Sequence, residues 1–240
     1  MKWFSYGGIC VIQEKLREVE AKIEESRQKR TRADRNEPVQ LVAVTKNHDV
    51  DAMREAIDAG ATAIGENRIQ EAREKYTTLE RKVDWHLIGH LQTNKAKYAV
   101  RMFDLIHSVD SENLALELDK AAGRIDKVQD VLVQVNLARE DSKSGIYRED
   151  LLPLLHKVDE LPHLRLCGLM CIAPNYDEVE RCRPLFQEMY EIFQKVKEIS
   201  FATANIKYLS MGMTHDYTIA IEEGANIVRV GTAIFGQRQY

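Results

Sequence analysis

The sequence predicts a single (β/α)8 TIM barrel preceded by an extra N-terminal helix. Short apolar segments typical of buried parallel strands alternate with amphipathic, helix-forming segments along the whole chain. The 240 residues, 44% of them hydrophobic, also match one barrel domain, which commonly has about 250 residues. An open doubly wound sheet is the alternative architecture, because it too alternates strands with helices.

The first part of the chain is expected to lie outside the barrel. Residues 10–33 show a thin apolar stripe amid charges, which predicts a polar amphipathic helix. A proline-containing break follows, and the apolar run 39–45 is the first strand, which ends at Lys46. We therefore divide the chain into an N-terminal segment and helix (1–35) and a barrel (36–240).

The remaining elements repeat the order strand then helix. The predicted strands are 61–64, 83–88, 103–106, 128–135, 164–169, 206–209 and 227–230. The predicted helices are 51–59, 67–79, 93–100, 111–122, 148–158, 177–199 and 217–222. Ser111 and Gly123 are residue types that begin and end helices, and they bound one of these segments.

Composition excludes several classes of partner. The net charge of −4 provides no basic field for nucleic acid or an anionic membrane surface. No apolar run approaches the roughly 20 residues that span a bilayer, and residues 1–12 lack the apolar core of a secretion signal. The four cysteines show no CxxC or metal-binding spacing. We expect a cytoplasmic protein that binds neither nucleic acid nor membrane.

Two loops suggest an anion site at the barrel mouth. In such barrels phosphate commonly binds after strands seven and eight. Here these loops, Ser210 to Thr214 and Gly231 to Gly236, both contain a hydroxyl group and a glycine that lets an anion approach the backbone. The alternative is structural, with Gly212 and Gly231 ending strands while Ser210 and Thr232 cap helices.

Lys46 is the candidate nucleophile. Lysine is rarely buried, yet Lys46 directly follows an apolar strand, so its amine should rise into the mouth. A desolvated amine has a lowered pKa and can attack an aldehyde. An ion pair between Lys46 and Glu66 fits the bare pattern equally well. The anion loops at the same mouth favour a Schiff base.

Arg229 lies within the otherwise apolar last strand and needs a partner there. A planar aromatic ligand with an acceptor nitrogen would supply one, whereas an outward-facing arginine could pair with a helix carboxylate. Asn67, after strand two, offers an amide to a ring substituent or a helix cap.

The histidines suggest no metal site. His86 and His90 are expected on opposite sides of a strand end with no carboxylate between them, so His86 is interpreted as a barrel-layer residue. His215 and Asp216 could form an acid–base pair, but the first turn of a helix is the preferred interpretation.

Lys46 and four segments together resemble the pyridoxal phosphate homeostasis family, the YggS-type proteins once labelled proline synthetase co-transcribed. The segments are Gly65 to Glu71, Trp85 to Lys95, Ser210 to Thr214 and Arg229 to Gly236. The resemblance covers about residues 35 to 236 and its combined motifs are specific. It implies a barrel like the N-terminal domain of alanine racemase, holding pyridoxal 5′-phosphate as an internal aldimine on Lys46.

The same resemblance assigns roles to the other site residues. It implies that Arg229 faces the pyridine nitrogen, which keeps that nitrogen unprotonated, weakens the cofactor as an electron sink and suits storage. It implies phosphate contacts from Ser210, Gly212, Gly231 and Thr232, and contacts to the ring from Asn67 and Met211. Two departures are Asn47-His48-Asp49 after the lysine, where relatives often have proline, and Thr214 in place of a more usual serine.

The expected function is therefore a carrier or buffer of the cofactor with little catalysis of its own. Apo enzymes that use pyridoxal phosphate are possible recipients, and a monomer or weak dimer is implied. A racemase of the alanine type is the alternative, but its second acid–base tyrosine lies in an added C-terminal domain, and this chain ends at Tyr240. Tyr217 could replace that tyrosine only in principle. A sugar-phosphate enzyme remains if Lys46 binds no aldehyde.

Overall fold

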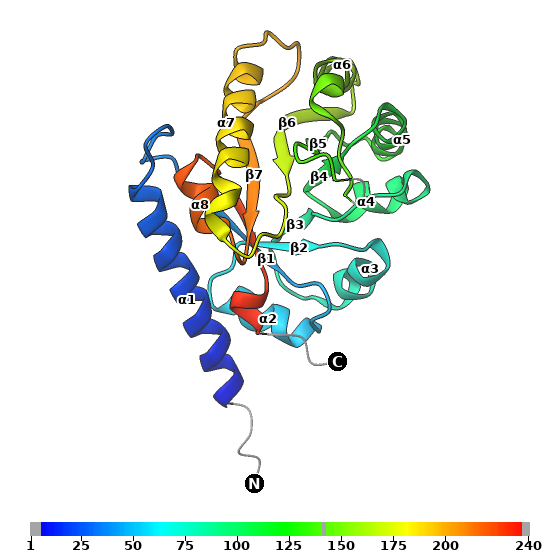
Figure 1. Ribbon diagram of the computed structural model, residues 1–240. Helices are drawn as coiled ribbons and strands as arrows, with labels where there is room; N and C mark the ends of the chain where they lie inside the picture. Colours follow the sequence, from blue (N-terminus) through cyan, green and yellow to red (C-terminus); the bar gives the residue numbers. More distant parts are fainter. Residues whose placement is uncertain (1–5, 141–142, 237–240) are drawn as a thin grey trace.

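The chain folds into a closed barrel of parallel strands surrounded by helices (Figure 1). The computed structural model describes residues 6–140 and 143–236. Its strands follow one another around the barrel in sequence order, and β8 pairs with β1. The predicted barrel is confirmed and the open sheet is excluded, because an open sheet leaves its two edge strands unpaired with each other. Residues 1–5, part of the segment interpreted above as lacking a secretion signal, lie outside the described residues.

The strands are short and lie close to the predicted segments. They are β1 (Gln40–Val44), β2 (Ala63–Glu66), β3 (Asp84–Leu87), β4 (Leu105–Val109), β5 (Gln129–Val135), β6 (Leu164–Cys171), β7 (Tyr208–Met213) and β8 (Ile227–Val230). Neighbouring strands are connected through helices, as parallel pairing requires.

The α-helices that cover the barrel are α1 (Tyr6–Gln28), α2 (Val50–Asp58), α3 (Ile69–Thr78), α4 (Ala96–Met102), α5 (Glu112–Gly123), α6 (Leu151–Asp159), α7 (Arg183–Lys197), α8 (Tyr217–Glu222) and α9 (Thr232–Phe235). Short 3-10 helices are η1 (Thr93–Lys95), η2 (Arg148–Asp150) and η3 (Val179–Cys182). Within the described ranges, none of the helices combines the length and apolarity that crossing a membrane requires.

Four predicted helices differ from those observed, because 93–100, 148–158 and 177–199 each include a 3-10 segment (η1, η2 and η3) and the N-terminal helix has other bounds. The predicted helix 177–199 consists of η3 followed by α7, with a proline in the first turn of α7, where its missing N–H removes no helical hydrogen bond. The N-terminal helix covers residues 6–28 instead of 10–33. It ends early because the chain turns, which lets Arg30 donate to carbonyl groups of the barrel domain.

Arg30 fastens the N-terminal helix to the barrel. Its side chain is 1% exposed and donates to the carbonyls of Ile221 at 3.1 Å and Ala225 at 2.6 Å, at the end of α8. It also donates to the carbonyls of Asp34 and Glu37 in its own segment. These carbonyls neutralise a buried cation, since a helix C-terminus carries partial negative charge. α1 therefore packs along α8 on the outside of the barrel (Figure 1).

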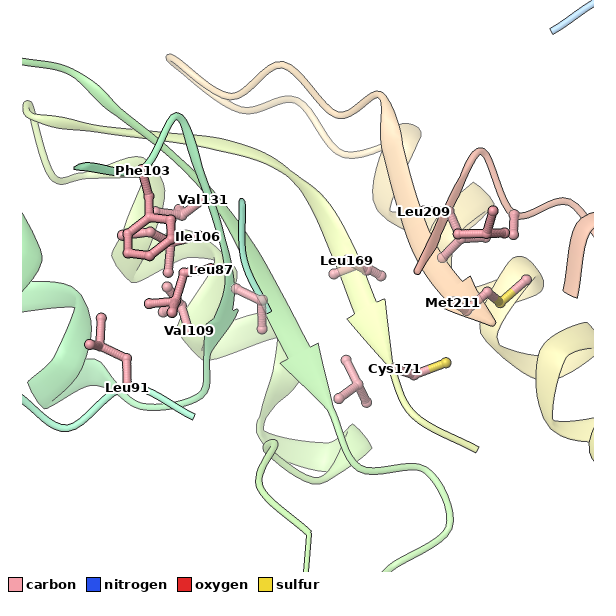
Figure 2. Packing of buried hydrophobic residues seen from close by; sticks show 14 of the residues in the cluster. Leu87, Leu91, Phe103, Ile106, Val109, Val131, Leu169, Cys171, Leu209 and Met211 are labelled. Carbon is pink, nitrogen blue, oxygen red and sulfur yellow. The ribbon is translucent and has the colours of Figure 1, made fainter. Parts of the chain in front are cut away.

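Side-chain alternation separates an inner core from an outer one. Val42 of β1 and Ile227 of β8 belong to the cluster inside the barrel, whereas their neighbours Ala43 and Val228 belong to the large cluster between strands and helices. Figure 2 shows part of the outer cluster, including Phe103 of the segment between α4 and β4. The residue that follows an outward position on a strand thus faces the barrel interior, which fixes the orientation of the candidate site residues.

Candidate functional site

Lys46 lies at the mouth, directly after β1. Its neighbour Thr45 points outward, because the Thr45 hydroxyl donates to Glu66 Oε1 at 2.6 Å and the same oxygen accepts from Lys75 Nζ of α3 at 2.7 Å. Alternation then directs Lys46, which is half-buried, toward the barrel interior. Glu66, weighed above as a partner for Lys46, is thus bonded to Thr45 and Lys75. The covalent role of Lys46 stays a prediction.

The residues after Lys46 form a tight turn beside the loop that follows β8. The His48 N–H donates to the Thr45 carbonyl at 3.0 Å, and Asn47 adopts a φ of 63°. Asparagine tolerates this left-handed conformation better than most residues other than glycine. The His48 ring stacks on Phe235 of α9, with 4.8 Å between ring centroids. The Lys46 turn and the last helix therefore pack together.

Arg229 lies inside the barrel on β8 and is 3% exposed. Its Nη1 donates to Ser210 Oγ at 2.5 Å and its Nη2 donates to the Cys171 carbonyl at 2.9 Å. Burial lowers the pKa of Arg229, whereas the charge of Asp216 raises it. Among the described residues, no carboxylate forms an ion pair with this guanidinium. The arginine faces the interior, and the alternative of an outward pair with a helix carboxylate is wrong.

Ser210, His107 and His86 continue from Arg229 as a chain of buried hydrogen bonds. His107 Nδ1 lies 3.0 Å from Ser210 Oγ, and His107 Nε2 lies 3.0 Å from His86 Nδ1. Burial lowers the pKa of His86 to about 4 and that of His107 well below its usual range. Both rings are therefore neutral at pH 7. The prediction that His86 is a barrel-layer residue is confirmed.

The direction of each hydrogen bond from Arg229 to His86 follows from the guanidinium at one end. A guanidinium only donates, so Ser210 Oγ accepts from Arg229 and its own proton is available for His107 Nδ1. His107 then carries its proton on Nε2 and donates it to His86 Nδ1. In this arrangement the hydroxyl of Ser210 accepts from Arg229 and donates to His107.

The segment Ser210 to Gly212 is not the loop that the sequence predicts. β7 continues to Met213 and pairs with β8 through Ser210↔Ile227 and Met213↔Arg229. Met211 points outward into the cluster that also contains Leu209 (Figure 2). Only the backbone of Met211 could therefore contact a ligand in the mouth. Gly212 has a φ of 94°, and a Cβ there would lie 2.7 Å from that of Ala220, so close packing of α8 already requires this glycine.

The turns after β7 and β8 do meet at the mouth. Thr214 Oγ1 accepts from the N–H of Gly231 at 3.3 Å, so the threonine keeps a hydroxyl in use at this position. The N–H groups of Ile234 and Phe235 both donate to the Gly231 carbonyl. Those of Thr232 and Ala233 lie in the first turn of α9, where the helix provides no acceptor for them, so they are suited to an anion. Thr232 is exposed, and Gly231 packs against Val44 of β1, which brings this turn next to Lys46.

Asn67 follows β2 at the same end of the barrel. Its Oδ1 is buried and has no hydrogen-bond partner among the described residues. Gly89, after β3, has no side chain because a Cβ there would lie 2.4 Å from the Asn67 carbonyl oxygen. A pocket of about 460 Å³ opens beside Asn67, and its lining also includes Arg68, His90 and Lys95. An amide left without a partner at a pocket is suited to a polar ligand.

Other candidates lie outside this site. Asp216 directly precedes α8, as the helix-start interpretation expects, and its side chain accepts from the Met213 N–H at 2.6 Å without capping the helix. Tyr217 is 5% exposed and packs in the outer cluster. His90 is exposed beside Asp110, with 3.5 Å between Nδ1 and the carboxylate. The described part of the chain contains no cluster of histidine, cysteine or acidic side chains suited to a metal ion.

Two groups of interacting residues were not predicted. One is His107, whose partners Ser210 and His86 come from two other strands and leave no local pattern. The other is a buried ion-pair cluster in which Lys75 Nζ donates to Glu66 at 2.7 Å and to Glu71 at 2.6 Å. The spacing of Glu71 and Lys75 on one helix was a visible signal, but it usually indicates an exposed pair.

Comparisons with known proteins identify the family. Residues 19–239 match the model of the alanine racemase N-terminal domain. The pyridoxal phosphate homeostasis protein of Aquifex aeolicus is 43% identical over 202 residues, which are 83% of this chain and 87% of that protein. The protein of that name from Pasteurella multocida is 38% identical over 95% of this chain and 98% of its own length.

Solved structures agree with the sequence matches. PipY from Synechococcus elongatus without PLP is 37% identical, has a TM-score of 0.83, and is matched over 94% of this chain and 100% of its own. The same protein with PLP bound has a TM-score of 0.79. An alanine racemase from Clostridium difficile shares the fold, with a TM-score of 0.71 at 15% identity over 58% of that enzyme. The chain belongs to the alanine racemase N-terminal domain family and, within it, to the pyridoxal phosphate homeostasis proteins.

Proposed function

We propose that this protein binds pyridoxal 5′-phosphate in the mouth of the barrel and serves in its intracellular homeostasis as a carrier or buffer. The cofactor is held covalently through the amine of Lys46, with little or no catalysis by the protein itself. The relatives named above support this proposal, since their names specify homeostasis and PipY has been solved with PLP bound.

The observation that carries the proposal is the buried guanidinium of Arg229. A cation at 3% exposure needs an acceptor, and its contacts are a hydroxyl and a carbonyl group. An unprotonated pyridine nitrogen is an acceptor of the required kind. β8 pairs with β1, Arg229 standing opposite Val42 four residues before Lys46, so the two groups lie on adjacent strands.

The other residues fit the remaining parts of the cofactor. The N–H groups of Thr232 and Ala233 in the first turn of α9, the Thr232 hydroxyl and the glycine at 231 suit the phosphate. The buried Oδ1 of Asn67, which has no hydrogen-bond partner among the described residues, suits a ring substituent that donates a hydrogen bond. When bound, pyridoxal phosphate supplies an aldehyde and an electron sink. Arg229 keeps the pyridine nitrogen without a proton, which weakens that sink and favours storage.

A carrier is preferred to a racemase for a structural reason. Racemisation needs acid–base groups on both faces of the substrate carbon. Tyr217, the candidate tyrosine within the barrel, is 5% exposed in the outer cluster, and burial raises its pKa. The relatives' names also describe homeostasis proteins. Incubation of the loaded protein with L-alanine should therefore produce no D-alanine above the rate with free cofactor.

The test of cofactor binding is an absorption spectrum before and after borohydride reduction. We expect a band at about 410–430 nm that reduction removes, with the modified peptide mapping to Lys46. Lys46→Ala should abolish the covalent adduct while circular dichroism shows an unchanged fold. Lys120→Ala is the matched control, because Lys120 is an exposed lysine of α5 outside the proposed site. A covalent adduct at this site in Lys46→Ala would overturn the assignment of the adduct to Lys46. A wild-type protein without the absorption band would favour the sugar-phosphate enzyme instead.

The partners and assembly form a second part of the proposal. Apo enzymes that use pyridoxal phosphate are the proposed recipients, and the carrier acts as a monomer or weak dimer. Light scattering over a range of concentrations measures the assembly. Mixing the loaded protein with an apo enzyme, with an equal concentration of free cofactor as control, measures transfer. Activation no faster than free cofactor allows would refute direct transfer.

A further inference from the structure

The ion-pair cluster of Glu66, Glu71 and Lys75, here called the Lys75 cluster, holds both peptide groups that flank Lys46. Lys75 Nζ donates to the Thr45 carbonyl at 2.8 Å, which belongs to the peptide group before Lys46. The N–H of Asn47, which belongs to the peptide group after Lys46, donates to Glu71 Oε1. The backbone rotations at Lys46 are thus fixed from both sides.

The cluster is an unusual choice if stability alone is considered. Lys75 is 6% exposed and Glu66 is 0% exposed, so both charges are taken out of water. Buried ion pairs are often no more stabilising than apolar residues of the same volume. What apolar residues cannot do is donate to a carbonyl and accept from an N–H at fixed positions. The cluster forms hydrogen bonds with the turn that carries Lys46, and one of them is donated by the Thr45 hydroxyl to Glu66.

The turn itself needs such support. Asn47 adopts a left-handed conformation that costs a non-glycine residue free energy unless its surroundings hold it. A lysine side chain is also long and flexible, and a covalent site needs its amine at one place. Helix α3 supplies Glu71 and Lys75 one turn apart on the face toward the turn, so a rigid element carries both anchors.

We propose that the Lys75 cluster is a positioning device for Lys46. Lys75 and Glu71 fix the turn from Thr45 to His48 so that the amine of Lys46 is directed into the barrel mouth, where the proposed function places the cofactor. None of the three cluster residues touches the cofactor in this proposal, and each acts through the backbone on either side of Lys46. The consequence for cofactor binding rests on the proposed function, whereas the effect on Lys46 exists without any ligand.

Glu71 gives the cleanest test, because its side chain is 22% exposed and can be changed without emptying the core. Glu71→Ala removes the acceptor of the Asn47 N–H. Glu71→Gln keeps an oxygen at that position and is the conservative variant. Glu74→Ala is the matched control: it removes the same charge from the same helix at an exposed position. Circular dichroism and thermal unfolding verify that each variant is folded.

Two readouts are needed. The first is the rate of acetylation of Lys46 in the ligand-free protein, followed by mass spectrometry with exposed Lys120 as the internal reference. We expect Glu71→Ala to raise the Lys46 rate at least threefold, because the released turn exposes the amine, and to leave Lys120 unchanged. The second is the dissociation constant for pyridoxal phosphate, expected to rise about fivefold to tenfold in Glu71→Ala. Glu71→Gln should stay within twofold of the wild type in both, and Glu74→Ala should equal it.

The outcomes separate the two proposals. An unchanged Lys46 rate and affinity in folded Glu71→Ala would overturn the positioning role. Equal losses in Glu71→Ala and Glu74→Ala would overturn it too, because they would indicate a general charge effect. A wild type without any adduct would refute the proposed function, while acetylation would still decide whether the Lys75 cluster controls Lys46.

Discussion

Replacing Lys75 by methionine should destabilise the protein through the charge that it leaves behind. Lys75 donates to three oxygens, on Thr45, Glu66 and Glu71, and its removal leaves Glu66 with the Thr45 hydroxyl alone. The second oxygen of Glu66 is already buried without a partner among the described residues. Breaking a buried pair on one side costs about 3–5 kcal/mol. At roughly 2–4 °C per kcal/mol for a chain of this length, Tm should fall by about 6–20 °C.

The loss should depend on pH with a definite sign. Burial raises the pKa of Glu66, and the charge and hydrogen bond of Lys75 oppose that rise. Without Lys75 the folded pKa of Glu66 rises further above its unfolded value, near 4.3. Stability linked to a raised carboxyl pKa is present below the unfolded value and is lost as pH rises through the folded one. Lys75→Met should therefore be destabilised less at pH 5 than at pH 8.

The assay is urea unfolding followed by circular dichroism at both pH values, with a second variant as control. Lys75→Met combined with Glu66→Gln removes the uncompensated charge but keeps an acceptor for the Thr45 hydroxyl, and should recover more than half of the lost free energy. If the double variant is as unstable as Lys75→Met, or the loss is the same at both pH values, the cause is lost packing of the lysine stem and the reasoning about charge is refuted.

Three further predictions concern other parts of the chain. Gly168→Ala places a Cβ 1.9 Å from the Tyr208 carbonyl oxygen and should prevent folding, whereas Gly60→Ala, with nothing within 4 Å, should cost only the strain of its positive φ, about 1–3 kcal/mol; equal urea midpoints would contradict this. Arg30→Met removes a buried guanidinium donor from the carbonyls of Ile221 and Ala225 and should cost about 3 kcal/mol or more, with Arg30→Lys recovering part, and an unchanged midpoint would argue against its role. Thr232→Val should weaken cofactor binding by about 1.5–3 kcal/mol without moving the absorption band, whereas Thr62→Val, directly before β2 and away from the mouth, should have no effect. Ser210→Ala should move the band, because Arg229 loses the hydroxyl to which it donates. An unmoved band in Ser210→Ala would contradict the assignment of Ser210.

The sequence was sufficient for the features that depend on local pattern. Apolar runs and helix breakers located the strands, so the end of β1 put Lys46 at the mouth. An arginine between apolar neighbours in Ile227–Val230 indicated a charge in need of a partner, but the pattern fitted an inward and an outward orientation equally, and the structure places Arg229 inside. His86 was correctly interpreted as a barrel-layer residue, because His86 and His90 lack the spacing of metal ligands.

Features that depend on register could not be obtained in this way. Glycine and hydroxyl residues suggested a loop at Ser210 to Gly212, but pairing with β8 keeps that segment extended and turns Ser210 inward and Met211 outward. The chain from Arg229 through Ser210 to His107 joins β8, β7 and β4, which only the closed barrel brings together. Glu71 and Lys75 carry a helical spacing, but their contacts to the Lys46 turn are tertiary.

The pairing of β1 with β8 means that the proposed site is assembled from the two ends of the barrel sequence. Lys46 follows the first strand, whereas Arg229, Gly231 and Thr232 come from the last. During synthesis Lys46 is therefore made 183 residues before Arg229 (229 − 46). A ligand that binds only the closed ring stabilises that ring by mass action, so cofactor supply would shift the balance between complete and opened barrels. The amount of folded carrier would then follow the amount of cargo.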